Sequence, residues 1–182
     1  FSDVNRTGVT VSNVTAQDKT YDGTTAATLT GKLTGVEDGD TVTLGSANVT
    51  ANFDNANVGE QKPVTIADGG IFDLRGKGAY KYELKTQPTD LTDLKADITP
   101  CTDIKATNTT QTIYVGESSF EAPKFTGVTV NGKTEEVTGD TAYTVGGVAK
   151  TADEIGKALK ALKTGEKLEI SYTFTPAKDG NY

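Results

Sequence analysis

The chain has 182 residues, which is enough for one large domain or two small ones that each bury a core. It carries 25 acidic and 18 basic residues, for a net charge of −7, and no basic stripe is visible. Nucleic acid and anionic lipid attract basic surfaces, so the composition excludes both as expected partners.

The remaining composition indicates a β-rich, non-membrane segment. The 20 Gly residues and the scarcity of helix formers outside one stretch predict many short strands joined by turns. No apolar run reaches the length that spans a bilayer, so we expect no membrane insertion. The chain has no Met, and we expect it to be a fragment of a longer secreted protein.

The one cysteine, Cys101, cannot form an intrachain disulfide. As a nucleophile it would need a base, normally His, and the chain has no His. We therefore interpret Cys101 as a small, semi-buried apolar residue.

In the first half, alternating apolar and polar residues predict about seven short strands separated by Gly-containing turns. In one of them, Tyr80, Tyr82 and Leu84 fall on the same face. This spacing favours an immunoglobulin-like β-sandwich. A β-grasp-like unit is the alternative, disfavoured because no crossover helix pattern precedes Pro100. The clearest strand signals lie at residues 9–14, 27–33, 41–44, 64–66, 80–85 and 94–98.

The stretch Lys19-Thr20-Tyr21-Asp22-Gly23-Thr24-Thr25 contains a strong turn signal. Gly23 takes a positive φ without strain, and Asp22 can bond its own backbone. We predict a tight turn at the end of a sheet, with Tyr21 packed over the rim of the core. The alternative is an exposed Tyr–Asp pair that contacts a ligand.

Five segments in a fixed order resemble the YDG domain, over roughly residues 14–100. They are Lys19-x-Tyr21-Asp22-Gly23-Thr24-Thr25, Gly35-Val36-x-x-Gly39-Asp40, Phe53-Asp54-Asn55-Ala56-Asn57-Val58-Gly59, Lys62-Pro63-Val64-Thr65-Ile66 and Ala96-Asp97-Ile98-Thr99-Pro100. One departure is Gly78-Ala79-Tyr80-Lys81-Tyr82, where the family reads closer to Gly-Asn-Tyr. The resemblance implies an extracellular bacterial setting, often in tandem and in adhesin-like surface proteins, and no defined chemistry.

The second half contains ordered echoes of the first, which indicate a divergent second copy. They are Tyr114-Val115-Gly116 for Tyr21-Asp22-Gly23, Lys124-Phe125-Thr126-Gly127-Val128 for Lys32-Leu33-Thr34-Gly35-Val36, Gly139-Asp140-Thr141 for Gly39-Asp40-Thr41, and Thr164-Gly165-Glu166 for Val58-Gly59-Glu60. Unrelated sandwiches that share turn composition are the alternative. We expect domains at residues 1–100 and 101–182.

One helix is predicted, at about residues 152–163. Thr151 and Glu154 form a capping-box pattern, and Ile155, Leu159 and Leu162 follow as one apolar stripe. Gly165 is the expected left-handed C-cap. We expect this helix to cover an open end or edge of the second sandwich. The alternative is a recognition helix that presents Lys157, Lys160 and Lys163.

No pattern predicts an enzyme or a cofactor. Glycoside hydrolysis needs two carboxylates facing one cleft, and the acidic residues here stand mostly in turns beside Gly. Asp38, Asp40 and Asp54 could supply oxygens to a cation, although turn formation explains them as well. Glycan binding usually requires exposed aromatic platforms, and the chain has no Trp. A Lys–Asn isopeptide cross-link beside a buried acid is a further alternative, but no signature selects a pair.

We therefore predict two tandem immunoglobulin-like domains that form a spacer in a bacterial cell-surface protein, with other domains of that protein as partners. The alternative is a module that binds host glycan or protein. Under the spacer hypothesis the important residues are structural: Tyr21, Asp22, Gly23, Phe53, Gly59, Tyr80, Tyr82, Tyr114, Phe125 and Leu159.

Overall fold

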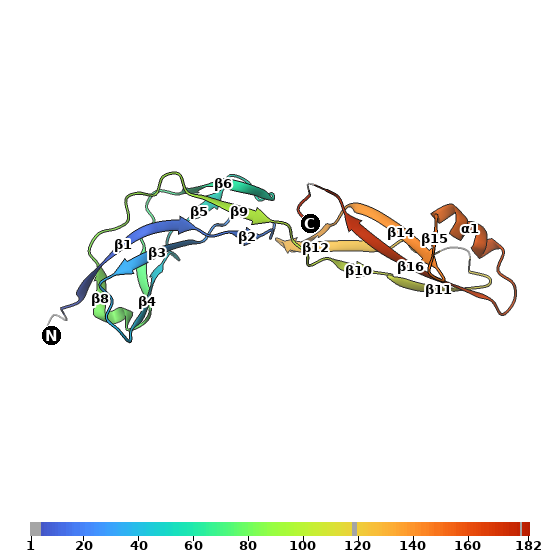
Figure 1. Ribbon diagram of the computed structural model, residues 1–182, viewed down its shortest axis with the longest axis horizontal. Coiled ribbons are helices and arrows are strands. Elements are labelled where there is room, and N and C mark those ends of the chain that lie inside the picture. The colour runs from blue at the N-terminus through green and yellow to red at the C-terminus, as the bar shows by residue number, and fades with distance from the viewer. Residues whose placement is uncertain (1–4, 118–119, 179) are drawn as a thin grey trace. The chain divides into compact units, whose positions relative to one another are not determined.

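A computed structural model describes residues 5–117, 120–178 and 180–182. Strands make up 50% of the chain and helix 7%, which confirms the prediction of an all-β fold. The residues divide into two compact units, Phe1–Thr99 and Pro100–Tyr182, which we call unit 1 and unit 2 (Figure 1). No described helix is long and apolar enough to cross a membrane.

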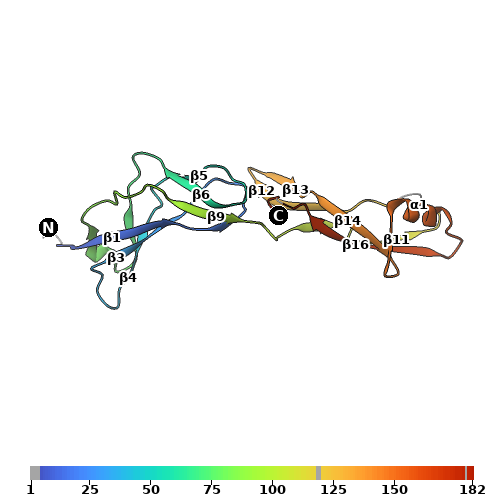
Figure 2. The ribbon, with the colours of Figure 1, turned by 45° about the horizontal axis from the view of Figure 1, so that its top comes forward.

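The described part of unit 1 contains nine strands and one turn of 3-10 helix. They are β1 (Thr7–Ala16), β2 (Lys19–Thr20), β3 (Leu29–Thr34), β4 (Thr41–Gly45), β5 (Ala51–Phe53), β6 (Gly59–Ile66), β7 (Asp73–Lys77), η1 (Ala79–Lys81), β8 (Tyr82–Leu84) and β9 (Lys95–Thr99). The sheets have the orders β3-β1-β8, β2-β9-β6-β5 and β4-β7 (Figure 2). The described part of unit 1 contains no α-helix of the kind that a β-grasp would need.

The core of unit 1 follows the period-two alternation of its strands. In β9, Ala96 and Ile98 are buried while their neighbours are not. In β6, Val64 is buried by the same alternation. Lys62 lies two residues earlier on the same face, and it is the one charged residue that is buried in the described chain. The core draws on strands of several sheets and on the loop residues beside them: Val9, Tyr21, Leu29, Ala51, Phe53, Val64, Phe72, Tyr82, Leu94, Ala96 and Ile98.

The strand predicted at residues 80–85 is only partly correct. Its N-terminal part is a turn, in which the Lys81 N–H donates to the carbonyl of Gly78 at 3.0 Å. Gly78 has φ 89°, so the chain enters this turn in the left-handed region. Tyr80 is therefore 72% exposed, and the prediction that it shares a buried face with Tyr82 is wrong.

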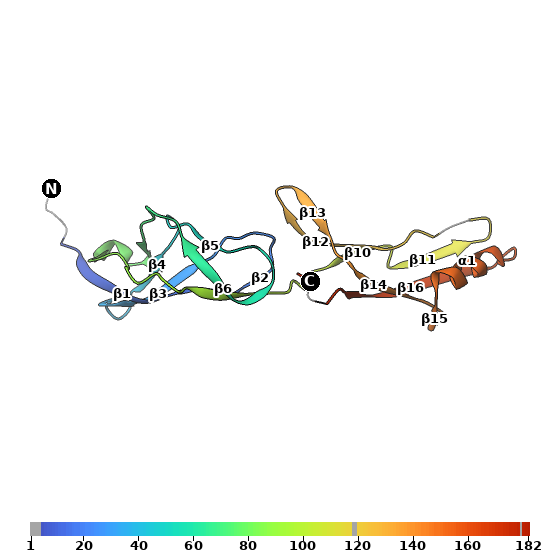
Figure 3. The ribbon, with the colours of Figure 1, turned by 90° about the horizontal axis from the view of Figure 1, so that it is seen from above.

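Among its described residues, unit 2 contains seven strands and one α-helix. They are β10 (Lys105–Thr107), β11 (Thr110–Tyr114), β12 (Lys124–Val130), β13 (Lys133–Glu136), β14 (Gly139–Val145), β15 (Val148–Lys150), α1 (Ala152–Lys160) and β16 (Lys167–Pro176). The sheets have the orders β10-β12-β13 and β11-β16-β14-β15 (Figure 3). The Phe125 ring stacks on Phe174, with centroids 3.8 Å apart, and meets Tyr172 edge-on, so Phe125 holds β12 against β16.

The predicted helix is present, and its capping box is formed. The Thr151 hydroxyl accepts from the Glu154 N–H at 3.1 Å, and the Glu154 carboxylate accepts from the Thr151 N–H at 3.3 Å. Ile155 and Leu159 are buried against Ile113 and Ile170 of the four-stranded sheet. The C-terminal prediction is wrong by one turn, because the cap is Ala161. Gly165, at φ 87°, serves a later turn, closed by the bond from the Glu166 N–H to Lys163 O.

Tyr21 and Tyr114, which the sequence similarity relates to each other, do not occupy equivalent positions in the two units. Thr20, just before Tyr21, pairs in parallel with Thr99 of the last strand of its unit. Tyr114 ends β11, which pairs antiparallel with the last strand of unit 2, and its side chain is 56% exposed. Tyr114 is therefore not a core residue, although it begins a turn, in which the Glu117 N–H donates to Tyr114 O at 3.1 Å and Gly116 has φ 92°.

In both units a tyrosine hydroxyl joins a carboxylate to a backbone N–H, within a turn in unit 1 and between strands β12 and β13 in unit 2. The Tyr82 hydroxyl donates to Asp40 at 2.6 Å and accepts from the Glu37 N–H at 3.0 Å. The Tyr182 hydroxyl donates to Glu135 at 2.6 Å and accepts from the Val128 N–H at 3.0 Å. In unit 2 this tyrosine stands in Gly180-Asn181-Tyr182, the family-like form of the motif that unit 1 lacks.

We expect unit 2 to lose stability between about pH 10 and pH 12. Burial and the bond to Glu135 raise the pKa of Tyr182 to about 12. Below about pH 10 the hydroxyl is neutral in the folded and unfolded chain alike; above it the unfolded chain loses the proton first, so the free energy of unfolding falls. Urea unfolding at stepped pH, followed by the isoleucine methyl NMR signals of unit 2, measures this.

The matched variants for this experiment are Tyr182→Phe and Tyr114→Phe. Tyr182→Phe should be less stable than the parent below pH 10 and should show a shallower decline above it. Tyr114→Phe removes an exposed hydroxyl and should follow the parent. If the free energy of unfolding of Tyr182→Phe fell above pH 10 as steeply as that of the parent, Tyr182 would not be the cause of the decline.

Candidate functional site

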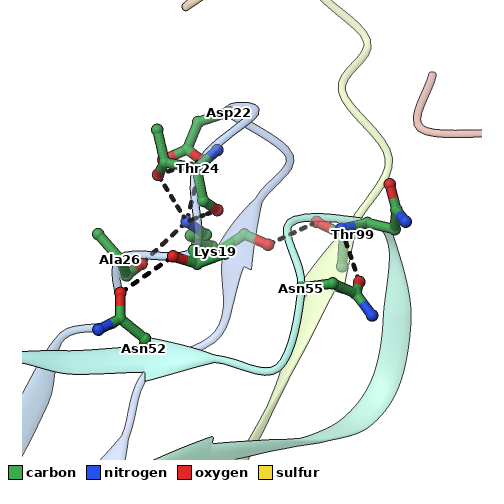
Figure 4. A network of polar contacts seen from close by, with 9 residues as sticks. Lys19, Asp22, Thr24, Ala26, Asn52, Asn55 and Thr99 are labelled. Atoms are coloured by element: carbon green, nitrogen blue, oxygen red, sulfur yellow. Dashed lines mark hydrogen bonds and ion pairs between the residues drawn. The ribbon is translucent and has the colours of Figure 1, made fainter. Parts of the chain in front are cut away.

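The polar residues of the Lys19–Thr25 motif are bonded chiefly to one another. Lys19 Nζ, at the start of β2, shares its three N–H donors among four oxygens: Asp22 Oδ1 at 2.9 Å, Thr24 O at 2.8 Å, Thr24 Oγ1 at 3.1 Å and Ala26 O at 2.9 Å (Figure 4). Its ammonium also lies 5.4 Å from the centre of the Phe53 ring, within range of a cation–π contact. One lysine thus holds the whole loop in shape.

Asp22 and Gly23 form the tight turn that the sequence predicts. Asp22 Oδ1 accepts from the Thr24 N–H at 2.9 Å and the Thr24 hydroxyl at 2.8 Å, and Gly23 has φ 78°. Partial burial alone would raise the pKa of Asp22, but the hydrogen bonds from Lys19 and Thr24 outweigh it and lower that pKa. The carboxylate is therefore kept ionised as a structural acceptor.

The motif loop is attached to β5 by backbone hydrogen bonds. The Phe53 N–H donates to Thr25 O at 2.7 Å, and the Ala27 N–H donates to Ala51 O at 2.9 Å. The Thr25 hydroxyl donates to Asn52 Oδ1 at 3.0 Å. The loop thus closes one side of the β2-β9-β6-β5 sheet.

A second lysine organises the loop between β5 and β6. Lys62 is only 8% exposed, and its Nζ lies 3.0 Å from Asp54 Oδ1 and 2.8 Å from Asn55 Oδ1. Its aliphatic stem lies 3.1–3.2 Å from the point where a Cβ on Gly59 would stand, so a side chain at residue 59 would have to displace this stem by a few tenths of an ångström. The lysines at the bases of these two neighbouring loops organise most of the YDG-like segments.

Lys62, Asn55 and Asp54 are the Lys–Asn–acid trio that an isopeptide cross-link would require. That reaction needs a neutral amine and a protonated, buried acid. Here the hydrogen bond from Lys62 lowers the pKa of Asp54, whose side chain is 45% exposed. The trio is therefore an ion pair with an amide acceptor, and its electrostatics oppose cross-linking.

The predicted structural residues fall into two groups. Tyr21, Phe53 and Tyr82 are buried in unit 1, Leu159 is buried in unit 2, and Phe125 is half-buried in the stack on Phe174. Tyr80 and Tyr114 are exposed, as described above. Cys101 is buried, in agreement with its interpretation as a small apolar residue.

The predicted cation ligands do not assemble. Asp40 is bonded to Tyr82 and lies 3.1 Å from Lys81, which together lower its pKa. Asp54 is paired with Lys62 instead. Across residues 5–117, 120–178 and 180–182, no group of three or more Asp, Glu, Cys or His side chains could hold a metal ion.

The central roles of Lys19 and Lys62 were not predicted from the sequence. Both stand inside the motif segments, but a lysine in a polar loop is normally read as a solvated charge. The available signal is the set of acceptors within three to eight residues of each lysine: Asp22, Thr24, Asp54 and Asn55. Tyr182 was also missed, although Gly180-Asn181-Tyr182 contains the family form of its motif.

These features define an all-β protein with a unit whose loop motifs are organised by internal lysine contacts. Residues 5–89 match the family model of the YDG domain, so the chain contains a YDG domain. The match begins before the predicted region of 14–100 and ends before β9, which nevertheless pairs with β2 and β6 in the same unit. No curated protein matches the chain, and no solved structure matches it.

Proposed function

We propose that the chain is a non-catalytic spacer of a bacterial cell-surface, adhesin-like protein, and that unit 2 is a divergent repeat following the YDG domain. The observation that carries this proposal is that the polar groups of the Lys19–Thr25 motif are bonded within the protein. Lys19, Asp22 and Thr24 bond one another and the adjacent backbone, and Lys62 is bonded in the same manner. Such groups stabilise a loop and have little bonding capacity left for a ligand.

The charge of the chain also supports a spacer. A net charge of −7 keeps neighbouring chains apart and soluble. Because there is no disulfide, each unit depends on its apolar core for stability, and unit 1 depends also on its two lysine-centred loops. The partners in this proposal are other domains of the same surface protein.

The second candidate is a module that binds host glycan or protein. Tyr80 favours it, because this exposed ring lines a cavity of about 410 Å³ together with Arg6, Glu83 and Gln87. Aromatic rings with nearby polar groups are common in ligand sites. In unit 2 the corresponding candidate is the exposed row of Lys157, Lys160 and Lys163.

A surface-display experiment separates the two functions. The chain is displayed on a carrier strain, and attachment to host cells and to a glycan array is compared with that of the carrier alone. The spacer hypothesis expects no added attachment from the parent, from a variant with Lys157, Lys160 and Lys163 changed to Glu, or from Tyr80→Ala. Both variants should fold, because these side chains are exposed and Ile155 and Leu159 are kept. Attachment by the parent that a folded variant loses would establish the binding function instead.

A further inference from the structure

In unit 1 the first and last parts of the chain run parallel to each other. Thr7 pairs with Tyr82 and Val9 with Leu84, in the parallel ladder between β1 and β8. Further along, Lys19 pairs with Ile98 and Thr20 with Thr99, in the parallel ladder between β2 and β9. Hydrogen bonds extend both ladders by one residue: the Lys85 N–H donates to Val9 O at 3.1 Å, and the Tyr21 N–H donates to Thr99 O at 2.8 Å.

In unit 2 the corresponding parts run antiparallel. The Cys101 N–H donates to Asn181 O at 2.9 Å, and the Tyr172 hydroxyl donates to Thr107 O at 2.8 Å. In the ladder between β11 and β16, Thr110 pairs with Ser171 and Tyr114 with Lys167. In unit 2 the residue number of the pairing partner thus falls along the first segment of the unit, whereas in unit 1 it rises.

This difference determines how a pulling force reaches the hydrogen bonds. Consider a unit pulled by its N- and C-terminal ends. If its first and last strands are parallel, the force acts on the start of the first strand and on the end of the last strand, which lie at opposite ends of the ladder between them. The strands must slide past each other, and the bonds, which lie across the strands, are loaded together. When antiparallel runs are pulled the same way, both forces act at one end, and the bonds open one after another, each worth only about 1 kcal/mol.

We propose that unit 1 resists tension by shear and that unit 2 yields first by unzipping, so that the chain lengthens under load while its YDG domain stays folded. This inference rests on the proposed spacer function, since only a segment under tension would use the difference. Resistance to force depends on the unfolding rate along the pulled direction, not on equilibrium stability alone. The inference can therefore be tested on the purified chain without any knowledge of its neighbours.

The test is single-molecule force spectroscopy of the full chain, held by tags at its two ends. The expected trace has two unfolding events, with the event of unit 2 at the lower force. Lengths identify the events, because Pro100–Tyr182 extends to at most about 300 Å and Phe1–Thr99 to at most about 350 Å, each less its folded span. Unfolding of unit 1 first, or of both units at one force, would overturn the proposal.

A change of pulling axis is the matched control for intrinsic stability. Val115 follows β11 directly and is partly exposed, so Val115→Cys, in a Cys101→Ser background, places a handle at the far end of that strand. Pulling between this handle and the C-terminus loads the same β11–β16 ladder in shear. The unfolding force of unit 2 should shift upward relative to end-to-end pulling of the Cys101→Ser chain. An unchanged force would overturn the mechanical inference and leave the attachment experiment unaffected.

Discussion

Replacing Lys19 with Met should destabilise unit 1 by about 2–3 kcal/mol, the upper part of the range for lost hydrogen bonds to a charged group. Met retains much of the aliphatic length of the side chain but removes the ammonium that joins Asp22, Thr24 and Ala26. The two carbonyl acceptors then depend on water in a partly buried loop, and Asp22 loses its ion pair. Urea unfolding of the chain, followed by methyl NMR signals of Val9 and Ile98, measures the loss.

The matched control for this prediction is Lys32→Met. The Lys32 side chain is exposed on β3 and makes no hydrogen bond or ion pair with the described residues, so its replacement should change the free energy of unfolding by no more than about 0.5 kcal/mol. Equal stabilities of the Lys19 and Lys32 variants would contradict the structural role of Lys19. Acid supplies an independent check, because the lowered pKa of Asp22 gives the parent stability that is lost as the pH falls below about 4. The Lys19→Met variant should lose less free energy of unfolding than the parent as the pH falls below about 4.

Replacing Ile155 with Ala should destabilise unit 2 by about 3 kcal/mol, the middle of the range for large-to-small substitutions in a core. Ile155 is fully buried, and it packs with Leu159 of the helix against Ile113 and Ile170 of the sheet. The lost methyl groups leave a cavity that the helix cannot fill without moving off its strands. Thermal unfolding monitored by the unit 2 methyl signals measures the change, and the unit 1 signals should keep their own transition.

Val148→Ala is the control for the helix prediction. Val148 is exposed at the start of β15, so its truncation removes little buried surface. Its cost should stay within about 0.5 kcal/mol. An Ile155 variant as stable as the Val148 variant would show that α1 does not contribute to the core of unit 2. The recognition-helix hypothesis would then gain support, because the apolar stripe would lack its structural function.

Together, the site and the fold suggest why this motif has the sequence it has. Lys19 closes the loop that precedes β3, and the same segment provides β2, which pairs with β9 at the end of the unit. Damage to the loop should therefore also weaken the parallel ladder that the mechanical inference depends on. Lys19→Met should accordingly lower the unfolding force of unit 1 as well as its equilibrium stability.

Features that depend on neighbouring residues were predictable from the sequence. The capping box of Thr151 and Glu154 and the stripe through Ile155 and Leu159 define the start and the buried face of the helix within a dozen residues. The turn at Asp22-Gly23 is equally local, because Gly tolerates the positive φ that the turn imposes. The all-β class follows from alternation and turn spacing in the same manner.

Features that depend on distant residues were not predictable. The alternation through Tyr80 and Tyr82 fits a strand, but the turn at Gly78 leaves Tyr80 in solvent, while Tyr82 reaches Asp40 across a separation of 42 residues. Tyr114 resembles Tyr21 in sequence, yet the pairing of its strand with β16 leaves it exposed. Whether the first and last strands of a unit are parallel or antiparallel was likewise not predictable. Parallel and antiparallel ladders accept similar alternating sequences, so only the complete set of strand pairings decides between shear and unzipping.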